Sequence, residues 1–211
     1  MNTRARVTYA FDAYCGWCYG FGPGLREFAE QNADRIELQV LSGGLFTGPQ
    51  AQPIGAFPHI RGANERISKL THVSFGDGYQ DVLEDGTRVM DSTDPATGLV
   101  ALRQQAPGRQ AEIAGAIQRA WYVDGRDLSD VKVYRDIATE LGLDADAVEA
   151  AYLGPATRAQ AEGDFQEVRE LGVDSYPTLL LHTETGVHRL GGAVSKAANL
   201  TKALNQHLDT V

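Results

Sequence analysis

The sequence predicts an α/β fold in which a helical domain is inserted between the two halves of a strand-containing unit. Two short apolar segments near the N-terminus and one near the C-terminus have the composition of buried strands. The long stretch between them has helical periodicity. Within the 211 residues, we therefore expect residues 1–60 and 157–211 to form one discontinuous domain and residues 61–156 to form the inserted helical domain.

The first half of the strand-containing unit has the order strand, helix, strand. Val7 to Phe11 is a run of β-branched and aromatic residues, and Ile36 to Val40 alternates apolar with polar residues, so both are predicted strands. The helix between them includes Leu25 to Glu30. Gly22 to Gly24 is expected to kink or restart this helix, because the central proline lacks a backbone donor and clashes with the preceding turn. Residues 42–60 are rich in glycine and proline and are predicted to form a loop.

The inserted segment contains apolar stripes at helical spacing, bounded by cap residues. Asp94 is predicted to cap one helix, with Pro95 in its first position, and Ser129 is predicted to cap another. Gly142 is expected to end the second helix, and Asp144 to cap the next one. The stripes consist of Ile113, Ile117, Ala120 and Trp121; of Tyr134, Ile137, Ala138 and Leu141; and of Val148, Ala151 and Tyr152.

The second half of the strand-containing unit begins with a helix that Gly172 is expected to end. Thr178 to His182 is a nearly continuous apolar run, which is typical of a central strand covered on both faces. Glu184 to Gly186 is a predicted turn, and Val187 to Leu190 is the predicted partner strand. The apolar residues that mark the helices on either side of these strands are Ala161, Phe165, Val168 and Leu171 and then Leu200, Leu204 and Leu208.

The composition is that of an ordinary globular protein, with 43% hydrophobic and 22% charged residues. The net charge of −9 argues against a nucleic-acid partner, because no block of Lys and Arg could neutralise a phosphate backbone. No stretch approaches the roughly 18 apolar residues of a membrane helix, so no membrane association is expected. Val7 to Phe11 is too short for the core of a signal peptide, and the expected location is cytoplasmic.

Both cysteines of the chain lie in one Cys-Gly-Trp-Cys motif at the predicted start of the first helix. The side chains of Cys15 and Cys18 can close a disulfide within one helical turn. A helix N-terminus favours negative charge, so we expect Cys15 to form the nucleophilic thiolate readily. Cys18 lies one turn inside and suits the resolving thiol, which displaces the substrate from a mixed disulfide. This motif between a strand and a helix is the signature of a thioredoxin-like fold.

A zinc pair and an inert buried pair are the alternative interpretations of the two cysteines. A closed zinc site needs four ligands, and the chain has neither a second such motif nor histidines at paired spacing, so no metal is expected. Asp12, three residues before the motif, is interpreted as a turn or cap residue rather than a proton-transfer group. Tyr14, Tyr19 and Phe21 are interpreted as core residues more readily than as a peptide groove.

Several neighbours of the motif are candidates for contact with a substrate. Gly16 allows close backbone approach, and Trp17 offers a flat apolar surface beside the reactive sulfur. Tyr176 and Pro177 stand just before the last central strand. If the peptide bond between them is cis, the backbone of Tyr176 can turn toward Cys15 and pair with an extended substrate. The predicted substrate-binding residues are therefore Gly16, Trp17 and Tyr176.

Two segments resemble the DsbA-like thioredoxin family, particularly its cytosolic FrnE-like branch. They are Tyr14 to Phe21 (YCGWCYGF) and Ser175 to Thr178 (SYPT). Arg119 to Asp130 is similar to the aromatic, glycine and aspartate pattern of the family's helical domain, and Leu141 to Asp144 matches the helix boundary that follows. The resemblance covers essentially the whole chain. It implies that the catalytic residues are Cys15, Cys18 and Pro177, the first as attacking thiol, the second as resolving thiol and the third as a cis proline.

The resemblance implies a thiol–disulfide oxidoreductase or isomerase that acts on protein or peptide thiols and disulfides. It implies no cofactor besides the protein's own redox-active Cys15–Cys18 disulfide, with glutathione as a candidate co-substrate. The Gly-Trp dipeptide does not fix whether the protein oxidises, reduces or isomerises, although a reducing cytosol favours reduction or redox sensing. The sequence is also compatible with an oligomer.

Two alternative functions remain open at this point. Kappa-type glutathione transferases and 2-hydroxychromene-2-carboxylate isomerases belong to the same fold group, but they use a serine where Cys15 stands and need no counterpart of Cys18. The other alternative is a non-catalytic binding module or holdase that uses the helical lobe. The chain also departs from thioredoxins, because Tyr9 stands six residues before Cys15, where thioredoxins keep a buried acid.

Overall fold

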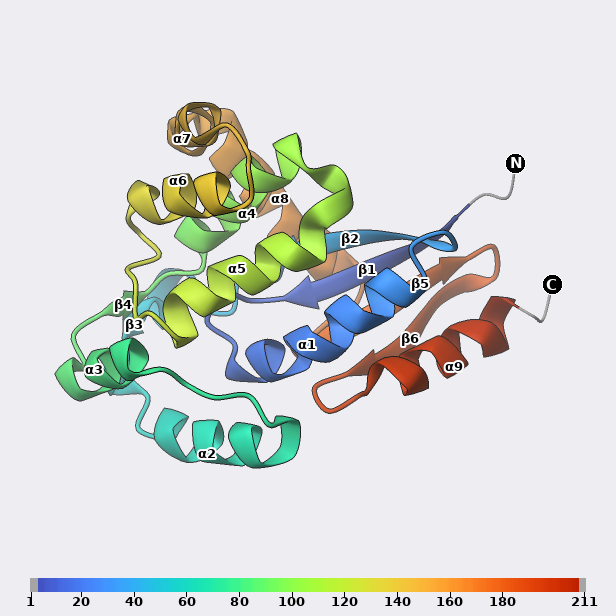
Figure 1. Ribbon diagram of the computed structural model, residues 1–211, viewed down its shortest axis with the longest axis horizontal. Coiled ribbons are helices and arrows are strands. Elements are labelled where there is room, and N and C mark those ends of the chain that lie inside the picture. Colours follow the sequence, from blue (N-terminus) through green and yellow to red (C-terminus); the bar gives the residue numbers. More distant parts are fainter. Residues whose placement is uncertain (1–3, 209–211) are drawn as a thin grey trace.

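The centre of the molecule is a four-stranded sheet of order β2-β1-β5-β6, whose strands lie between layers of helices in Figure 1. The computed structural model describes residues 4–208. The strands are β1 (Ala5–Phe11), β2 (Ile36–Ser42), β5 (Thr178–Thr183) and β6 (Gly186–Gly192). β1 pairs parallel with β2 and antiparallel with β5, which pairs antiparallel with β6. The strands β1 and β5, which are far apart in the sequence, are therefore neighbours in the middle of one sheet.

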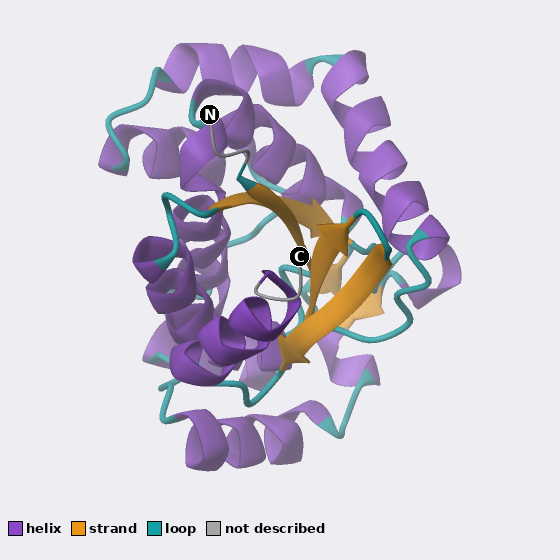
Figure 2. Ribbon diagram, turned by 90° about the vertical axis from the view of Figure 1, so that its right-hand side faces the viewer, coloured by secondary structure: helices purple, strands orange, loops and turns teal. Residues whose placement is uncertain are grey.

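Helices make up most of the rest of the described chain, and they surround the strands in Figure 2. They are α1 (Gly16–Gln31), α2 (Ile60–Thr71), α3 (Asp77–Asp85), α4 (Thr93–Gln105), α5 (Gln110–Tyr122), α6 (Val131–Glu140), α7 (Ala145–Leu153), α8 (Pro155–Glu170) and α9 (Ala197–Leu208). The short elements are the 3-10 turns Gly48–Gln50, Ile54–Ala56 and Pro107–Arg109 and the paired strands β3 (Gln52–Pro53) and β4 (Val89–Met90). This mixed architecture confirms the predicted α/β, thioredoxin-like fold class.

Side chains alternate between two buried faces of the sheet, as the pleat of a strand requires. From β1, Tyr9 and its neighbours two residues away join the main core, to which α1, α5 and α9 also contribute. Ala10 points to the other face, where it packs with Leu41 of β2 and Val168 of α8. Figure 1 shows α1 and α9 in front of the sheet and α8 behind it. β5 is consequently covered on both faces, as its apolar run predicts.

Helices α5, α6, α7 and α8 pack around α4, in which every residue from Pro95 to Leu102 is buried. This all-round burial explains why α4 has no clear polar face in its sequence. The predicted stripe of α5 is buried, and so is that of α6 apart from Leu141, which is partly buried and follows the end of the helix. The division into domains at residues 60 and 156 stays a prediction, and its outermost residues, 1–3 and 209–211, lie outside the described chain.

The expected break at Gly22 to Gly24 is wrong, because α1 continues through Pro23 to Gln31. Pro23 is on the exposed side of the helix, while Phe21, Leu25 and Phe28 are buried against the core. Packing of these side chains stabilises the helix more than the missing backbone hydrogen bond destabilises it. The predicted loop at 42–60 is also partly wrong, because it contains two 3-10 turns and β3.

The predicted helix ends are confirmed at three positions and wrong at two. Asp144 caps α7 by accepting the backbone N–H groups of residues 146 and 147 at 3.0 Å. Gly142 and Gly172 adopt positive φ after α6 and α8, a conformation that favours glycine. In contrast, α4 begins at Thr93, before the predicted cap Asp94, and α6 is capped by the residue after Ser129, Asp130. The Ser129 hydroxyl donates instead to the Asp127 carboxylate at 2.7 Å.

Packing of α4 against α6 leaves no space at Gly98. A Cβ atom there would lie 2.0 Å from the ring of Tyr134. We expect Gly98→Ala to lower the free energy of unfolding by about 1–3 kcal/mol, because the buried ring must move. Gly163→Ala in α8 is the matched control, since its Cβ would meet nothing within 4 Å and should raise that free energy by about 0.5–1 kcal/mol. Urea unfolding of both variants checks the prediction, and equal effects would contradict it.

Candidate active site

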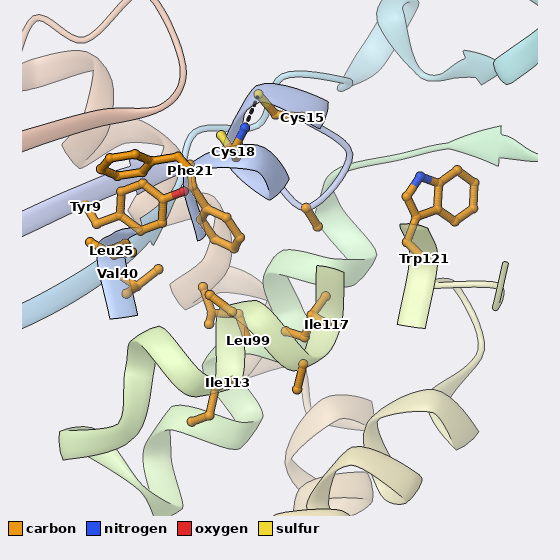
Figure 3. Close-up of a cluster of buried hydrophobic side chains, with 14 of the residues drawn as sticks. Tyr9, Cys15, Cys18, Phe21, Leu25, Val40, Leu99, Ile113, Ile117 and Trp121 are labelled. Atoms are coloured by element: carbon orange, nitrogen blue, oxygen red, sulfur yellow. Dashed lines mark hydrogen bonds between the residues drawn. The ribbon is translucent and has the colours of Figure 1, made fainter. Parts of the chain in front are cut away.

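Cys15 lies at the N-cap of α1, directly beyond the loop that follows β1. Its backbone N–H donates to the Asp12 carbonyl at 3.1 Å, and its extended backbone points the thiol back over the first helical turn. The Sγ atom of Cys15 accepts the backbone N–H of Cys18 at 3.3 Å, the contact drawn as a dashed line in Figure 3. The sulfur thus takes the place that a serine or aspartate oxygen takes in an ordinary helix cap.

The two cysteines differ in their environments. Both are free thiols, but Cys15 keeps 7% of its surface exposed whereas Cys18 keeps none. Burial, followed by the neighbouring Cys15 thiol, raises the pKa of Cys18 well above its ordinary value. Cys15 is therefore the cysteine that a substrate can reach from solution. Cys18 lies inside the core, where burial favours the neutral thiol.

The peptide bond between Tyr176 and Pro177 is cis, as the resemblance implies. The antiparallel pairing of β1 with β5 brings this segment beside the cysteine motif, with Ala10 opposite Thr178. The backbone carbonyl of Tyr176 lies 3.7 Å from Cys15 Sγ. The side chain of Tyr176 turns away and donates its hydroxyl to the Gly43 carbonyl at 3.0 Å. Two segments that are far apart in the sequence thus meet at the reactive sulfur.

Another segment does approach the backbone of Gly16 closely, but this segment is helix α2 of the same chain rather than a substrate. A Cβ on Gly16 would lie 2.9 Å from the Ile67 side chain of α2, and Gly20, one turn later, is equally close to it. These glycines let α2 pack tightly on the first turns of α1. Trp17 is partly buried, and the guanidinium carbon of Arg66 lies 5.9 Å from its ring centroid. The Trp17 ring therefore packs partly against α2.

Asp12 is fully buried and serves as an anchor for two loops. One carboxylate oxygen accepts the Tyr14 N–H at 3.0 Å, and the other accepts the Leu45 N–H at 2.9 Å. The first bond stabilises the turn after β1, which is the role that the sequence predicts for Asp12. The second bond holds the loop after β2 close to the segment that precedes the cysteine motif. Burial raises the pKa of Asp12, while these N–H donors oppose the rise.

The aromatic residues that flank the cysteines are packed into the molecule. Tyr14 and Phe21 are at most 5% exposed, which confirms their interpretation as core residues. Tyr14 packs edge-to-face on Trp121 with ring centroids 4.9 Å apart. Tyr19 is only partly buried, and it stacks on Tyr122 at 4.8 Å.

Sequence reasoning missed the contributions of α2 and of the loop after β2. Ile67 covers the glycine side of α1, and Gly43 supports the Tyr176 ring. A sequence signal existed only for the first of these, because Gly16 and Gly20 are spaced one turn apart, as in a helix that accepts a close neighbour. Within residues 4–208, no group of three or more His, Cys, Asp and Glu side chains could hold a metal ion. No helix in the same range is long and apolar enough to cross a membrane.

A strand, a helix capped by the first cysteine and a cis proline beside that cysteine define a thioredoxin-like protein with a Cys-x-x-Cys site. Residues 6–204 match the family model of the DSBA-like thioredoxin domain. The chain therefore belongs to this family. No curated protein sequence matches the chain.

Solved structures with the same fold cover nearly the whole chain. The cytosolic disulfide reductase DsbM from Pseudomonas aeruginosa is 28% identical, with a TM-score of 0.82 over 98% of this chain and 100% of that chain. A structure of DsbM with GSH is 29% identical, with a TM-score of 0.78 over 97% of this chain and 99% of that one. Reduced DsbA1 from Neisseria meningitidis is 15% identical, with a TM-score of 0.60 over 98% and 85% of the two chains, and shows the fold alone.

Gly43→Ala tests whether the Tyr176 segment must be held in place. A Cβ on Gly43 would lie 2.1 Å from the Tyr176 ring, so the ring and its backbone must shift. We expect kcat/KM for a disulfide substrate to fall about ten- to hundred-fold, because the Tyr176 carbonyl borders Cys15 Sγ. Alkylation of Cys15 by a small reagent should keep its rate. Gly62→Ala, whose Cβ meets nothing within 4 Å, is the control, and a similar loss in it would contradict the prediction.

Proposed function

We propose that this protein is a thiol–disulfide oxidoreductase in which Cys15 attacks and Cys18 resolves. The observation that carries the proposal is the position of Cys15 Sγ, between the Cys18 N–H at 3.3 Å and the Tyr176 carbonyl at 3.7 Å. The N–H groups of the first helical turn stabilise negative charge on this sulfur. The backbone of Tyr176 can pair with an extended peptide that carries the sulfur to be attacked.

The proposed reaction has two displacements at sulfur. In the first, the Cys15 thiolate attacks a substrate disulfide, and one substrate sulfur leaves as a thiolate. In the second, Cys18 loses its proton and attacks Cys15 Sγ, which breaks the mixed disulfide and releases the other substrate thiolate. The substrate gains two electrons, and the protein is left with a Cys15–Cys18 disulfide. Gly16, Trp17 and Tyr176 are the proposed substrate contacts: the first two follow Cys15 in the chain, and the carbonyl of the third lies 3.7 Å from Cys15 Sγ.

Reduction in the cytosol is the proposed direction of the reaction, with glutathione as electron donor. The support is the similarity to DsbM, which is described as a cytosolic disulfide reductase and has a structure with GSH. Two glutathione molecules would return the Cys15–Cys18 disulfide to the dithiol and leave as glutathione disulfide. No other cofactor is required, because the electrons pass only between sulfur atoms.

A glutathione redox titration of the purified protein tests this function. Protein equilibrated with defined ratios of reduced and oxidised glutathione is alkylated, and the modified cysteines are counted by mass spectrometry. We expect one reversible two-electron transition, with a midpoint near the cytosolic glutathione potential of about −220 to −260 mV, because glutathione cannot reduce a disulfide whose potential lies well below its own. The absence of any transition would overturn disulfide chemistry. A midpoint near that of DsbA, about −120 mV, would retain the chemistry and reverse the direction.

A further inference from the structure

The hydroxyl of Tyr9 is a buried polar group without a hydrogen-bond partner among the described residues. Tyr9 is only 1% exposed, and its ring is fixed between Phe11 and Phe21, with centroids 5.5 and 5.7 Å away. Figure 3 shows the hydroxyl directed toward the end of α1 that carries Cys18. Leaving a buried hydroxyl unpaired costs free energy, so a group of this kind in a native core calls for an explanation.

The group that acts most strongly on this hydroxyl, after burial itself, is Cys18. Burial, and next the charge of a Cys18 thiolate, raise the pKa of Tyr9 well above its ordinary value. The phenol therefore keeps its proton in the neutral range, so it can donate a hydrogen bond to Cys18 but cannot act as a base. A neutral thiol is a weak hydrogen-bond acceptor, whereas a thiolate is a strong one. The Tyr9 hydroxyl is thus a better hydrogen-bond partner for the Cys18 thiolate than for the neutral Cys18 thiol.

The other titratable groups around Cys18 are Cys15, Asp12, Tyr122 and Tyr176. Two of them, Asp12 and Tyr176, are already engaged in hydrogen bonds elsewhere. The carboxylate of Asp12 accepts two backbone N–H groups, and its charge opposes a thiolate at Cys18. The hydroxyl of Tyr176 is donated to Gly43. Tyr9 combines complete burial, proximity to Cys18 and a hydroxyl with no other acceptor.

We propose that Tyr9 donates a hydrogen bond to the Cys18 thiolate during the resolving step. This inference rests on the proposed function, because it concerns the second of the two displacements. The proton of Cys18 passes to solvent, the thiolate attacks Cys15 Sγ, and the Cys15–substrate bond breaks as the substrate thiolate leaves. Tyr9 keeps its own proton throughout and stabilises the charge on Cys18 until the new disulfide forms. In a dry site, such a preorganised donor is more effective than one exposed to water.

The two displacements can be separated with Ellman's reagent, an aromatic disulfide that releases a yellow thiolate at each of them. The first release depends on reagent concentration and reports attack by Cys15, whereas the second is unimolecular and reports attack by Cys18. For Tyr9→Phe, we expect an unchanged first phase and a second phase slowed about tenfold at pH 7. We also expect the pH midpoint of the second phase to rise by about one unit, the equivalent of tenfold. At high pH the rates of variant and wild type should converge.

The matched control is Tyr134→Phe in α6, which removes a buried hydroxyl that donates to the Leu128 carbonyl. This control should leave both phases unchanged. A Tyr9→Phe second phase equal to wild type, or slowed equally at every pH, would overturn the role of Tyr9. If wild-type protein shows only a single phase, the failure lies instead with the proposed dithiol mechanism.

A second measurement covers the case in which Tyr9→Phe does not fold. Wild-type protein made with 3-fluorotyrosine has stronger phenol donors and nearly unchanged side-chain volumes. Its second phase should be faster than that of ordinary protein at pH 7, and its first phase should be unaltered. An unchanged second phase in the fluorinated protein would overturn the proposal without any use of the Tyr9 variant.

Discussion

Replacing Cys15 with serine is expected to lower disulfide-reducing activity by about 10³-fold or more, because no other thiol can start the reaction. Cys18 is fully buried and cannot replace it. Cys18→Ser should also lose turnover, but for a different reason. Its Cys15 thiolate can still attack, and the mixed disulfide then persists because the resolving thiol is missing. Coupled reduction of a disulfide-containing peptide measures the first effect, and trapped adducts on non-reducing gels measure the second.

The double variant, with serine at both positions, is the control for adducts that form elsewhere on the protein. Thermal melting of each reduced variant should stay close to that of wild type, since serine is slightly smaller than cysteine and the Cys15 position is a helix cap where serine is favoured. Full client binding and activity in Cys15→Ser would contradict the redox function and favour the holdase alternative. Glutathione transfer to an electrophile that survives in Cys18→Ser would favour the transferase alternative.

The parts of the fold that follow from local patterns could be predicted from the sequence. The strand at Val7 follows from its β-branched and aromatic residues, and the strand at Thr178 follows from a continuous apolar run that burial on both faces requires. The cap at Asp144 and the end at Gly142 were predicted because helix ends have their own local chemistry. The break at Pro23 was wrongly predicted, since local propensity says nothing of the packing that holds α1 against the sheet.

In the candidate site too, local features can be predicted from the sequence, whereas contacts between distant segments cannot. Cys15 and Cys18 lie within one helical turn, so their pairing is visible in the sequence. Contacts made by distant segments are not visible, because the register of β1 with β5 and the position of α2 arise only when the whole core forms. Gly43 carries no signal in the sequence, and the spacing of Gly16 and Gly20 indicates a close neighbour of α1 without identifying Ile67. Tyr9 was noticed only as a departure from the thioredoxin pattern, and its unpaired hydroxyl became evident only in the structure.

A buried ion pair connects the inserted helices to the sheet and the second half of the chain. Arg103 of α4 donates to the Asp164 carboxylate of α8 at 2.8 Å and to the Val40 carbonyl of β2 at 2.8 Å. Both side chains of the pair are at most 10% exposed. Burial raises the pKa of Asp164, and the Arg103 guanidinium opposes this rise. Removing only the arginine would leave a buried carboxylate without its counter-charge.

Arg103→Met is therefore expected to lower the free energy of unfolding by about 3–5 kcal/mol at pH 8. Because folding raises the pKa of Asp164, the penalty for its charge is absent below the unfolded pKa and complete above the folded one. Without Arg103 the folded pKa rises further, so the loss should shrink as the pH falls toward 5 and the carboxyl becomes neutral. Urea unfolding at the two pH values measures the difference.

The double variant Arg103→Met with Asp164→Leu separates the buried charge from simple loss of packing. With both charged groups gone, most of the lost free energy of unfolding should return, and its dependence on pH should disappear. A loss in Arg103→Met that is equal at pH 5 and pH 8 would instead assign the effect to the Val40 carbonyl, the other partner of this arginine. The charge of Asp164 would then contribute little to the junction between α4 and α8.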